Sequence, residues 1–203
     1  VKRGDWSEPG AKPFNAGSIA GKRGGRGRLD LQRVPIGIAA ARYPRLGAPL
    51  SALELLEQAI QSNPEALALH KLRGDILATF RGPQEAVQAY DLVLSTQPAA
   101  LDVRWAKWSV LVWWGQDNEA IAELRHIAHI DRRNPLAHFR LAQELRKVDR
   151  LEESLDSFTQ AVHLMPGILS WRLALARAKF DVLDYQGAEA EVQTVLQRLP
   201  PGS

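Results

Sequence analysis

Apolar residues recur along residues 33–200 at the spacing of one face of an α-helix, and no segment alternates as a β-strand would. The spacing is clearest in PQEAVQAYDLVLST (residues 83–96) and LEESLDSFTQAVHL (residues 151–164). Polar residues occupy the other faces of these segments, and prolines separate them from their neighbours. The pattern predicts an all-α chain of amphipathic helices joined by short turns.

The prolines also mark a repeat of 34 residues. Prolines occur with this spacing at Pro64, Pro98, Pro166 and Pro200, and Arg132 stands at the position where the series lacks a proline. Self-similarity at a fixed period of this length indicates stacked helical repeats. The series predicts a tail of residues 1–32 and a repeat domain of residues 33–200. The five copies are residues 33–66, 67–100, 101–134, 135–168 and 169–200.

Equivalent positions of the copies, counted from 1 at the start of each copy, hold residues of similar size. Small residues predominate at position 8 (Ala40, Gly74, Trp108, Ala142, Ala176) and at position 20 (Ala52, Ala86, Ala120, Ser154, Ala188). Apolar residues fill position 24 (Leu56, Tyr90, Leu124, Phe158, Val192) and position 27 (Ala59, Val93, Ile127, Ala161, Val195). Small residues let the two helices of a copy approach closely, and the larger ones fill the space between copies.

This pattern resembles the tetratricopeptide repeat (TPR) family over residues 33–200. The resemblance implies a right-handed superhelical array of antiparallel helix pairs, an α-solenoid. The first copy departs from the family pattern, because Pro44 follows Tyr43 directly and Gly47 comes soon after. We expect the first helix of that copy to be short or irregular.

Four of the six tryptophans lie within ten residues, in the first helix of the third copy. The apolar run beside them, VLVWW, is far shorter than the roughly 18 residues of a membrane span. At 100° per residue, Trp114 points away from Trp105, so the four side chains cannot serve one pocket. We expect Trp108 and Trp114 to be structural, with Trp108 prising its helix pair apart, and Trp105 and Trp113 to be available for recognition.

The family resemblance implies that positions 2, 5, 9, 12 and 13 of each first helix line a concave groove. The candidate partner-binding residues there are Lys71, Trp105, Ser109, Trp113, Phe139, Gln143, Arg146 and Arg177. Position 4 adds a basic ladder of His70, Arg104, His138 and Arg172. Aromatic and cationic groups together suit an extended peptide with apolar anchors and some acidic residues. The alternative is a solvated helix face whose positive character Asp102 and Asp181 dilute.

Catalytic and metal-binding patterns are weak. His126 and His129 are three residues apart with Asp131 nearby, but no further ligands complete a site. The segment GSIAGKRGG lacks both the spacing and the hydroxyl residue of a phosphate-binding loop, and no nucleophile motif occurs. We therefore expect a protein that is not an enzyme, with no metal, cofactor or small-molecule substrate.

Charge is distributed unevenly along the chain. Residues 1–34 carry a net charge of +5, whereas residues 35–203 carry −2. The Gly-, Pro- and Arg-rich tail predicts disorder, because it cannot bury enough apolar area to offset its ordering entropy. Three roles stay open for it: a tether, docking on a protein, and binding of nucleic acid or an anionic membrane. The aromatic residues favour docking, and the cations suit all three roles; these candidates are Trp6, Phe14, Lys22, Arg23, Arg26 and Arg28.

The absence of cysteine excludes disulfides, thiol catalysis and thiolate metal sites but leaves the compartment open. With 45% hydrophobic and 24% charged residues, the composition is that of a soluble globular protein, cytoplasmic or periplasmic. A first residue other than Met is typical of a processed chain or of a piece of a longer one.

The patterns together predict a non-enzymatic scaffold or adaptor that binds partner proteins in its groove and through its tail. The family resemblance implies a multi-protein assembly such as a secretion, pilus or polysaccharide-export complex. The alternative is a nucleic-acid-associated adaptor that uses the basic tail. At the C-terminal end, we expect the face that bears Val192, Val195 and Leu196 to pack on the preceding elements. The side that a sixth copy would cover stays open, and Leu173, Leu175 and Phe180 contribute to that end. We expect a partner, a second copy of the chain or further chain to occupy that end.

Overall fold

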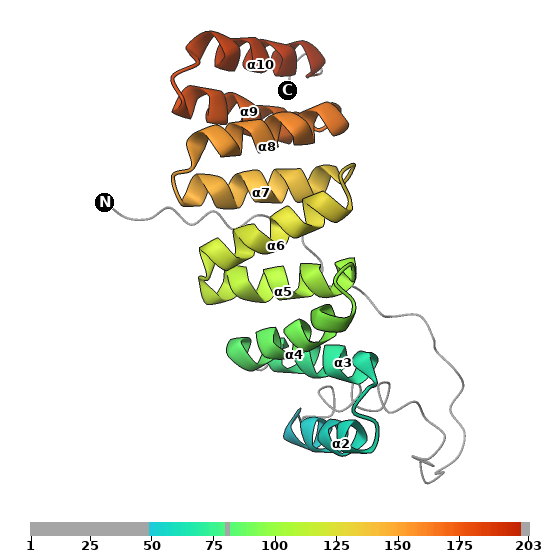
Figure 1. Cartoon of the computed structure of the whole chain (residues 1–203). Coiled ribbons are helices and arrows are strands. Elements are labelled where there is room, and N and C mark those ends of the chain that lie inside the picture. The colour runs from blue at the N-terminus through green and yellow to red at the C-terminus, as the bar shows by residue number, and fades with distance from the viewer. Residues whose placement is uncertain (1–48, 80–81, 200–203) are drawn as a thin grey trace, which may run out of the picture. The chain divides into compact units, whose positions relative to one another are not determined.

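The computed structural model describes residues 49–79 and 82–199, and these residues form helices and turns without any strand. The helices, labelled as in Figure 1, are α2 (Pro49–Ser62), α3 (Leu67–Thr79), α4 (Pro83–Thr96), α5 (Leu101–Trp114), α6 (Asp117–Ile130), α7 (Pro135–Lys147), α8 (Leu151–Leu164), α9 (Leu169–Asp181) and α10 (Tyr185–Arg198). The all-α prediction is therefore confirmed.

Two sets of predictions fall outside the described residues. One is the irregular helix expected around Tyr43. The other is the tail with its candidate residues Trp6, Phe14, Lys22, Arg23, Arg26 and Arg28.

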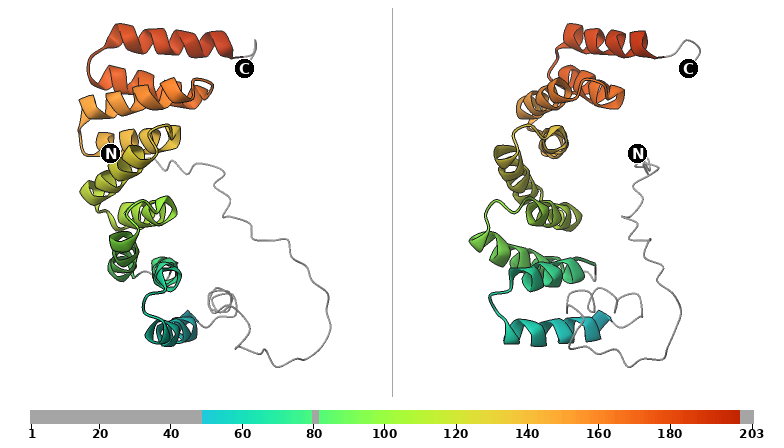
Figure 2. Two further views of the ribbon diagram at one scale, coloured as in Figure 1. Left: turned by 45° about the vertical axis from the view of Figure 1, so that its right-hand side comes forward. Right: turned by 90° about the vertical axis from the view of Figure 1, so that its right-hand side faces the viewer.

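Consecutive helices form antiparallel pairs that stack in chain order (Figures 1 and 2). The closest associations are within the pairs α3–α4, α5–α6, α7–α8 and α9–α10, and each pair also packs against the next. The first helices begin at Leu67, Leu101, Pro135 and Leu169, which are 34 residues apart. Each of the helices in the described part has 13 or 14 residues, and none is long and apolar enough to cross a lipid bilayer.

Particular residues cap the starts of some helices and form the turns that end others. Asn134 and Asp184 accept hydrogen bonds from the backbone N–H groups of Ala137 and Gly187, which caps the starts of α7 and α10. The turns inside the α5–α6, α7–α8 and α9–α10 pairs use a left-handed residue at position 15. That residue is Gly115 (φ 80°), Asp149 (φ 60°) or Leu183 (φ 66°). Only the glycine adopts this conformation without strain.

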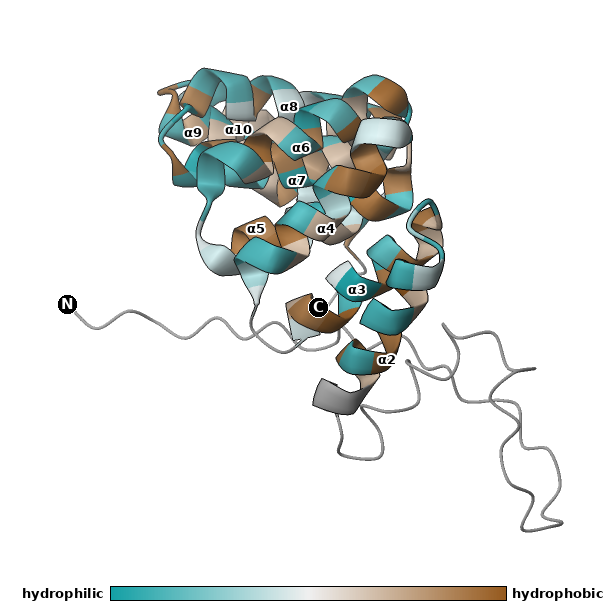
Figure 3. Cartoon of the chain, turned by 60° about the horizontal axis from the view of Figure 1, so that its bottom comes forward, coloured by the Kyte–Doolittle hydropathy of each residue, from teal (hydrophilic) through white to brown (hydrophobic). Residues whose placement is uncertain are grey.

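The core lies between the helices, so that most helices carry both hydrophobic and hydrophilic segments in Figure 3. The predicted large residue at position 24 is buried in three successive pairs, with Tyr90, Leu124 and Phe158 at 0–3% exposure. The small residues at positions 8 and 20 permit close packing, as the Oγ of Ser154 shows by donating to the carbonyl of Ala142 at 2.8 Å. These contacts follow the size pattern of the sequence.

Trp108 interrupts the size pattern, because an indole stands where the other copies have Gly or Ala. Its ring packs against the core cluster of α4 and α5 and also against that of α6 and α7, which confirms a structural role. The α5–α6 pair packs less extensively than the other three pairs, in agreement with the expected widening. Trp114 was also expected to be structural, but 37% of its surface is exposed, so its ring is packed only in part.

Candidate partner-binding groove

The candidate groove is the surface formed by positions 2, 5, 9, 12 and 13 of α3, α5, α7 and α9. Ion pairs between neighbouring first helices show that these positions face one another across the repeats. Lys71 Nζ lies 3.8 Å from Asp102 Oδ2, which joins α3 to α5. Arg146 Nε lies 2.7 Å from Asp181 Oδ2, which joins α7 to α9. The first helices therefore present these positions as one surface.

A hollow of about 550 Å³ opens between α7, α8 and α9. Its lining residues are Gln143, Arg146, Lys147, Asp149, Leu151, Phe158, Ala174 and Asp181. Two of them, Gln143 and Arg146, were predicted from the sequence as groove residues. The volume lies within the range of about 300–1,000 Å³ that is typical of binding pockets in proteins.

One carboxylate organises the charges at this hollow. Asp181 is only 15% exposed and accepts hydrogen bonds from Arg146 Nε at 2.7 Å and from Arg177 Nε at 3.0 Å. The side chains of Arg146 and Arg177 are 41% and 62% exposed, and their terminal nitrogens make no hydrogen bond with the described residues. Asp181 thus orients both arginines while leaving N–H donors directed to other acceptors.

Three aromatic rings pack together in the core beside the hollow, and one of them, Phe158, lines it. Phe139 stacks on Trp171 with ring centroids 4.5 Å apart and an interplanar angle of 13°, and its edge meets Phe158 at 5.4 Å. Phe139 is therefore half-buried, and part of its ring belongs to the core. It was predicted as a recognition residue, but its ring is also part of the core packing.

Trp105 is likewise tied into the core. Its ring meets Trp108 edge-on at 5.4 Å and packs against the cluster that contains Ile121 and Leu124. Trp113, by contrast, is 59% exposed at the end of α5. Of the two tryptophans expected to be available for recognition, Trp113 is the one whose ring is largely free.

The N-terminal part of the groove is neutralised by internal ion pairs. Lys71 Nζ lies 3.0 Å from Asp75 Oδ2, in addition to its contact with Asp102. The Tyr90 hydroxyl donates to Asp75 at 2.8 Å, and burial together with that carboxylate raises the pKa of Tyr90 above its ordinary value. Ser109 is exposed, but its hydroxyl donates to the carbonyl of Ala106 in its own helix. These residues offer a ligand less than the arginines do.

The basic ladder at position 4 is not part of the groove, and this expectation is corrected. His70 is 9% exposed and Arg104 8% exposed. Each side chain of the ladder in α3, α5 and α7 hydrogen-bonds the backbone carbonyl six residues earlier. These pairs are His70 with Pro64 (2.8 Å), Arg104 with Pro98 (2.8 Å) and His138 with Arg132 (3.1 Å). The ladder thus fixes α3, α5 and α7 to the turns that precede them.

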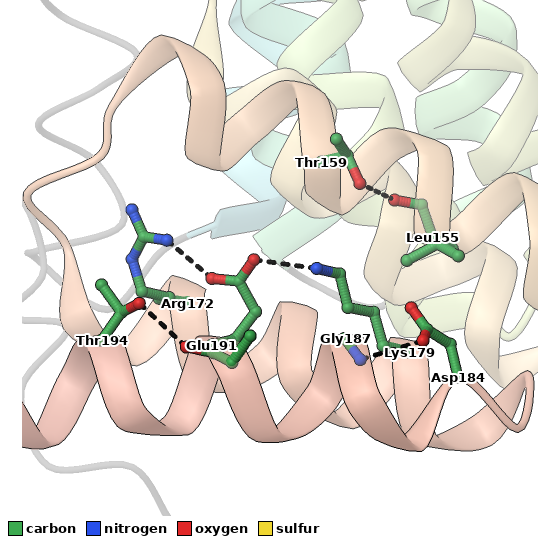
Figure 4. A network of polar contacts seen from close by, with 9 residues as sticks. Leu155, Thr159, Arg172, Lys179, Asp184, Gly187, Glu191 and Thr194 are labelled. Carbon is green, nitrogen blue, oxygen red and sulfur yellow. Dashed lines mark hydrogen bonds and ion pairs between the residues drawn. The ribbon is translucent and has the colours of Figure 1, made fainter.

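The arginines of the ladder also form buried ion pairs with position 23. Arg104 Nη1 donates to Glu123 at 2.7 Å, and Arg172 Nη1 donates to Glu191 at 2.6 Å (Figure 4). Both pairs span 19 residues, and the acid occurs in the two copies that have Arg at position 4. In the sequence, Arg at position 4 occurs together with Glu at position 23, and this correspondence could have predicted the ion pairs.

Lys107 completes the network in the third copy. It contacts Glu123 and Asp91 at 2.7 Å each and so connects α4, α5 and α6. Burial alone would lower the pKa of Lys107, but its hydrogen bonds with Asp91 and Glu123 outweigh that effect and raise it. The charged groups of this network are mostly buried and join helices to one another, so the network is structural and not part of the groove.

The histidines of α6 lie away from these groups. His126 and His129 are exposed. Within residues 49–79 and 82–199, no three histidine, cysteine or carboxylate side chains lie close enough together to hold a metal ion.

Comparison with known proteins identifies the fold. No protein-family model and no curated protein sequence matches the chain. Among solved structures, MamA from Desulfovibrio magneticus RS-1 (residues 41 to the end) superposes with a TM-score of 0.65 at 22% identity, over 80% of this chain and 92% of that one. A MamA RS-1 double mutant gives 0.67 at 22% identity, over 80% and 91%.

YrrB, described as a TPR protein with an unusual peptide-binding site, gives a TM-score of 0.65 at 16% identity. The match covers 83% of this chain and 87% of that one. The stacked helix pairs therefore have the tetratricopeptide repeat fold, as the sequence pattern predicts. The fold does not by itself assign a function, which depends on the groove.

Proposed function

We propose that the chain is a protein-interaction scaffold that binds an extended segment of a partner protein along the groove, without catalysing a reaction. The observation that carries this proposal is the hollow between α7, α8 and α9, whose lining combines the exposed Arg146 with the ring of Phe158. The peptide-binding site of YrrB, which shares the fold, gives independent support.

The chemistry of the hollow suggests the partner segment. Phe158 and Ala174 supply apolar surface for an anchoring side chain. Arg146 has terminal N–H donors that make no hydrogen bond with the described residues and are available to a carboxylate, and Asp149 and Asp181 disfavour a long acidic run. The proposed segment therefore has an apolar or aromatic anchor with one acidic residue beside it, and Trp113 would contact its continuation along α5.

The second part of the proposal concerns the protein assembly in which the chain binds its partner. Secretion, pilus and polysaccharide-export complexes are the assemblies that the family resemblance suggests. The residues predicted to carry binding are those of the groove, with Gln143, Arg146 and Trp113 foremost.

Affinity purification with the full chain as bait tests this function. A Trp113→Ala/Arg146→Ala double variant should lose a partner that the wild-type chain retains, because both residues are exposed in the groove. A His126→Ala/His129→Ala variant is the control, since these exposed side chains lie on α6. Equal recovery by the groove variant, or loss by the control alone, would contradict the proposal.

The tail offers the second candidate function, although residues 1–32 lie outside the described part of the chain. A basic tail that binds nucleic acid would give affinity for single-stranded RNA or DNA that falls steeply with salt. Deletion of residues 1–32 would abolish that affinity. Salt-dependent binding that needs the tail, together with unchanged partner recovery by the Trp113→Ala/Arg146→Ala variant, would favour the nucleic-acid-associated adaptor.

A further inference from the structure

The last helix pair displays apolar residues that the preceding pairs bury. At position 24, Val192 is 39% exposed, whereas Tyr90, Leu124 and Phe158 are at most 3% exposed. At position 28, Leu196 is 63% exposed, compared with 8% for Leu94 and 6% for Val162. Val192 and Leu196 were expected to pack on the preceding elements with Val195, and that expectation is corrected for these two residues. In the preceding pairs, these positions belong to core clusters that include the next first helix. The face of α9 and α10 is therefore built like an interface.

A second hollow, of about 430 Å³, lies on this face between the two helices. We call the surface that lines this hollow the end face. Its residues are Leu173, Ala176, Arg177, Phe180, Tyr185, Ala188, Glu189 and Val192. The lining is mostly apolar, and its two charged residues, Arg177 and Glu189, come from opposite walls. Single exposed apolar residues are ordinary on proteins, but a contiguous group of this kind marks an interaction surface.

The two walls of the end face match each other across the turn at Leu183. Residues equally far from the turn of an antiparallel pair lie at the same height, because each advances about 1.5 Å along its helix. Arg177 and Glu189 are each six residues from Leu183. Phe180 and Tyr185 are three and two residues away, and their rings meet at 5.3 Å. The same rule places Leu173 level with Val192.

We propose that two copies of the chain associate through their end faces, about a two-fold axis parallel to α9 and α10. Such a rotation places α9 of one copy on α10 of the other while preserving height along the helices. Arg177 then faces Glu189 of the second copy, and the contact occurs twice because the interface is isologous. Leu173 packs on Val192 of the second copy in the same way.

The charges favour a second copy over an unrelated helix. The end face carries one cation and one anion in places that become complementary only when the face meets itself. Arg177 can turn toward the second copy at little cost, because it is 62% exposed and Asp181 keeps its ion pair with Arg146. Glu189 is exposed and accepts a hydrogen bond only from Gln193 of its own helix among the described residues.

Sedimentation of the full chain over a concentration series tests the proposal. The wild-type chain should pass from monomer to dimer mass. Arg177→Glu and Glu189→Arg should each raise the dissociation constant at least about ten-fold, since each sets like charges against each other at both contacts. An equimolar mixture of the two variants should regain the dimer, because the reversed charges then complement each other.

Arg132→Glu is the matched control for charge reversal at an exposed arginine, and it should dimerise as the wild type does. Circular dichroism of each variant should match the wild type. A chain that stays at monomer mass overturns the proposal, as does a mixture that fails to dimerise. A monomeric chain whose residues 185–196 become protected from hydrogen exchange by a purified partner overturns it in favour of a partner helix.

Discussion

The ring of Tyr90 lies so close to Gly74 that a β-carbon at residue 74 would stand 2.5 Å from its Cε1 atom. The hydroxyl of the same ring donates to Asp75, so the ring is held at both its edge and its tip. The contact joins α3 to α4 at positions 8 and 24 of the repeat. A large residue at position 24 thus depends on a small one at position 8.

Gly74→Ala should therefore destabilise the chain by about 1–3 kcal/mol, the usual cost of overpacking a close core contact. Urea unfolding followed by circular dichroism measures the change in the free energy of unfolding. Gly167→Ala is the control, because nothing lies within 4 Å of a β-carbon there. Equal effects of the two substitutions would contradict the assigned packing.

Two tryptophans of α5 provide a comparison between a packed and an exposed ring. Trp108→Ala should cost about 3 kcal/mol or more, because the ring fills space between two core clusters. Trp113→Ala should change the free energy of unfolding by roughly 0.5 kcal/mol or less, since its ring is 59% exposed. Thermal or urea unfolding of both variants checks the difference. A tolerated Trp108→Ala would show that the neighbours of that ring can close the gap.

The Glu191 ion pairs predict a dependence of stability on pH. Burial alone would raise the pKa of Glu191, but hydrogen bonds from Lys179 and Arg172 outweigh it and lower the pKa (Figure 4). Because the folded pKa lies below the unfolded one, this stabilisation is present above about pH 4.3 and is lost as the pH falls through the folded pKa.

Glu191→Gln should accordingly lower stability near neutral pH and flatten the decline of the free energy of unfolding in acid. Urea unfolding at a series of pH values measures both effects. Glu152→Gln serves as the control, because Glu152 is exposed and has no ion pair with the described residues. An unchanged pH profile for Glu191→Gln would refute the assigned ion pairs.

The left-handed turn residues predict a stabilising substitution. Leu183 has a φ of 66°, a conformation that costs an L-residue about 1 kcal/mol and costs glycine little. Leu183→Gly should raise the free energy of unfolding by about that amount, because Leu183 is 70% exposed and loses little packing. Gly115→Ala at the equivalent position should do the opposite. Destabilisation by Leu183→Gly would mean that Leu183 contributes buried contacts, for example in a dimer.

The period of 34 residues was enough to predict the helix pairs, because small and large residues alternate between positions that face each other inside a pair. The same positional reasoning failed for the ladder at position 4. Position along a helix fixes the direction of the Cα–Cβ bond but not where a long side chain ends. Arg104 and His70 turn back to the carbonyls of the preceding turn, which the sequence shows only as a spacing of six residues.

The groove was predictable in part. Its helix positions followed from the family resemblance, and two of the predicted residues, Gln143 and Arg146, line the hollow. The degree to which each aromatic ring is free could not be predicted, because it depends on contacts with other copies. Trp105 meets Trp108 and Phe139 stacks on Trp171, so both are supports as well as candidate contacts.

The central claim is that the exposed groove residues bind a partner segment, and calorimetric titration of the captured partner onto the full chain tests it most directly. Trp113→Ala and Arg146→Ala should each weaken binding at least about ten-fold, or about 1.4 kcal/mol, with unchanged helicity. Arg132→Ala, an exposed arginine in a turn, should bind as the wild type does. Dissociation constants of both groove variants within roughly two-fold of the wild-type value would contradict the claim.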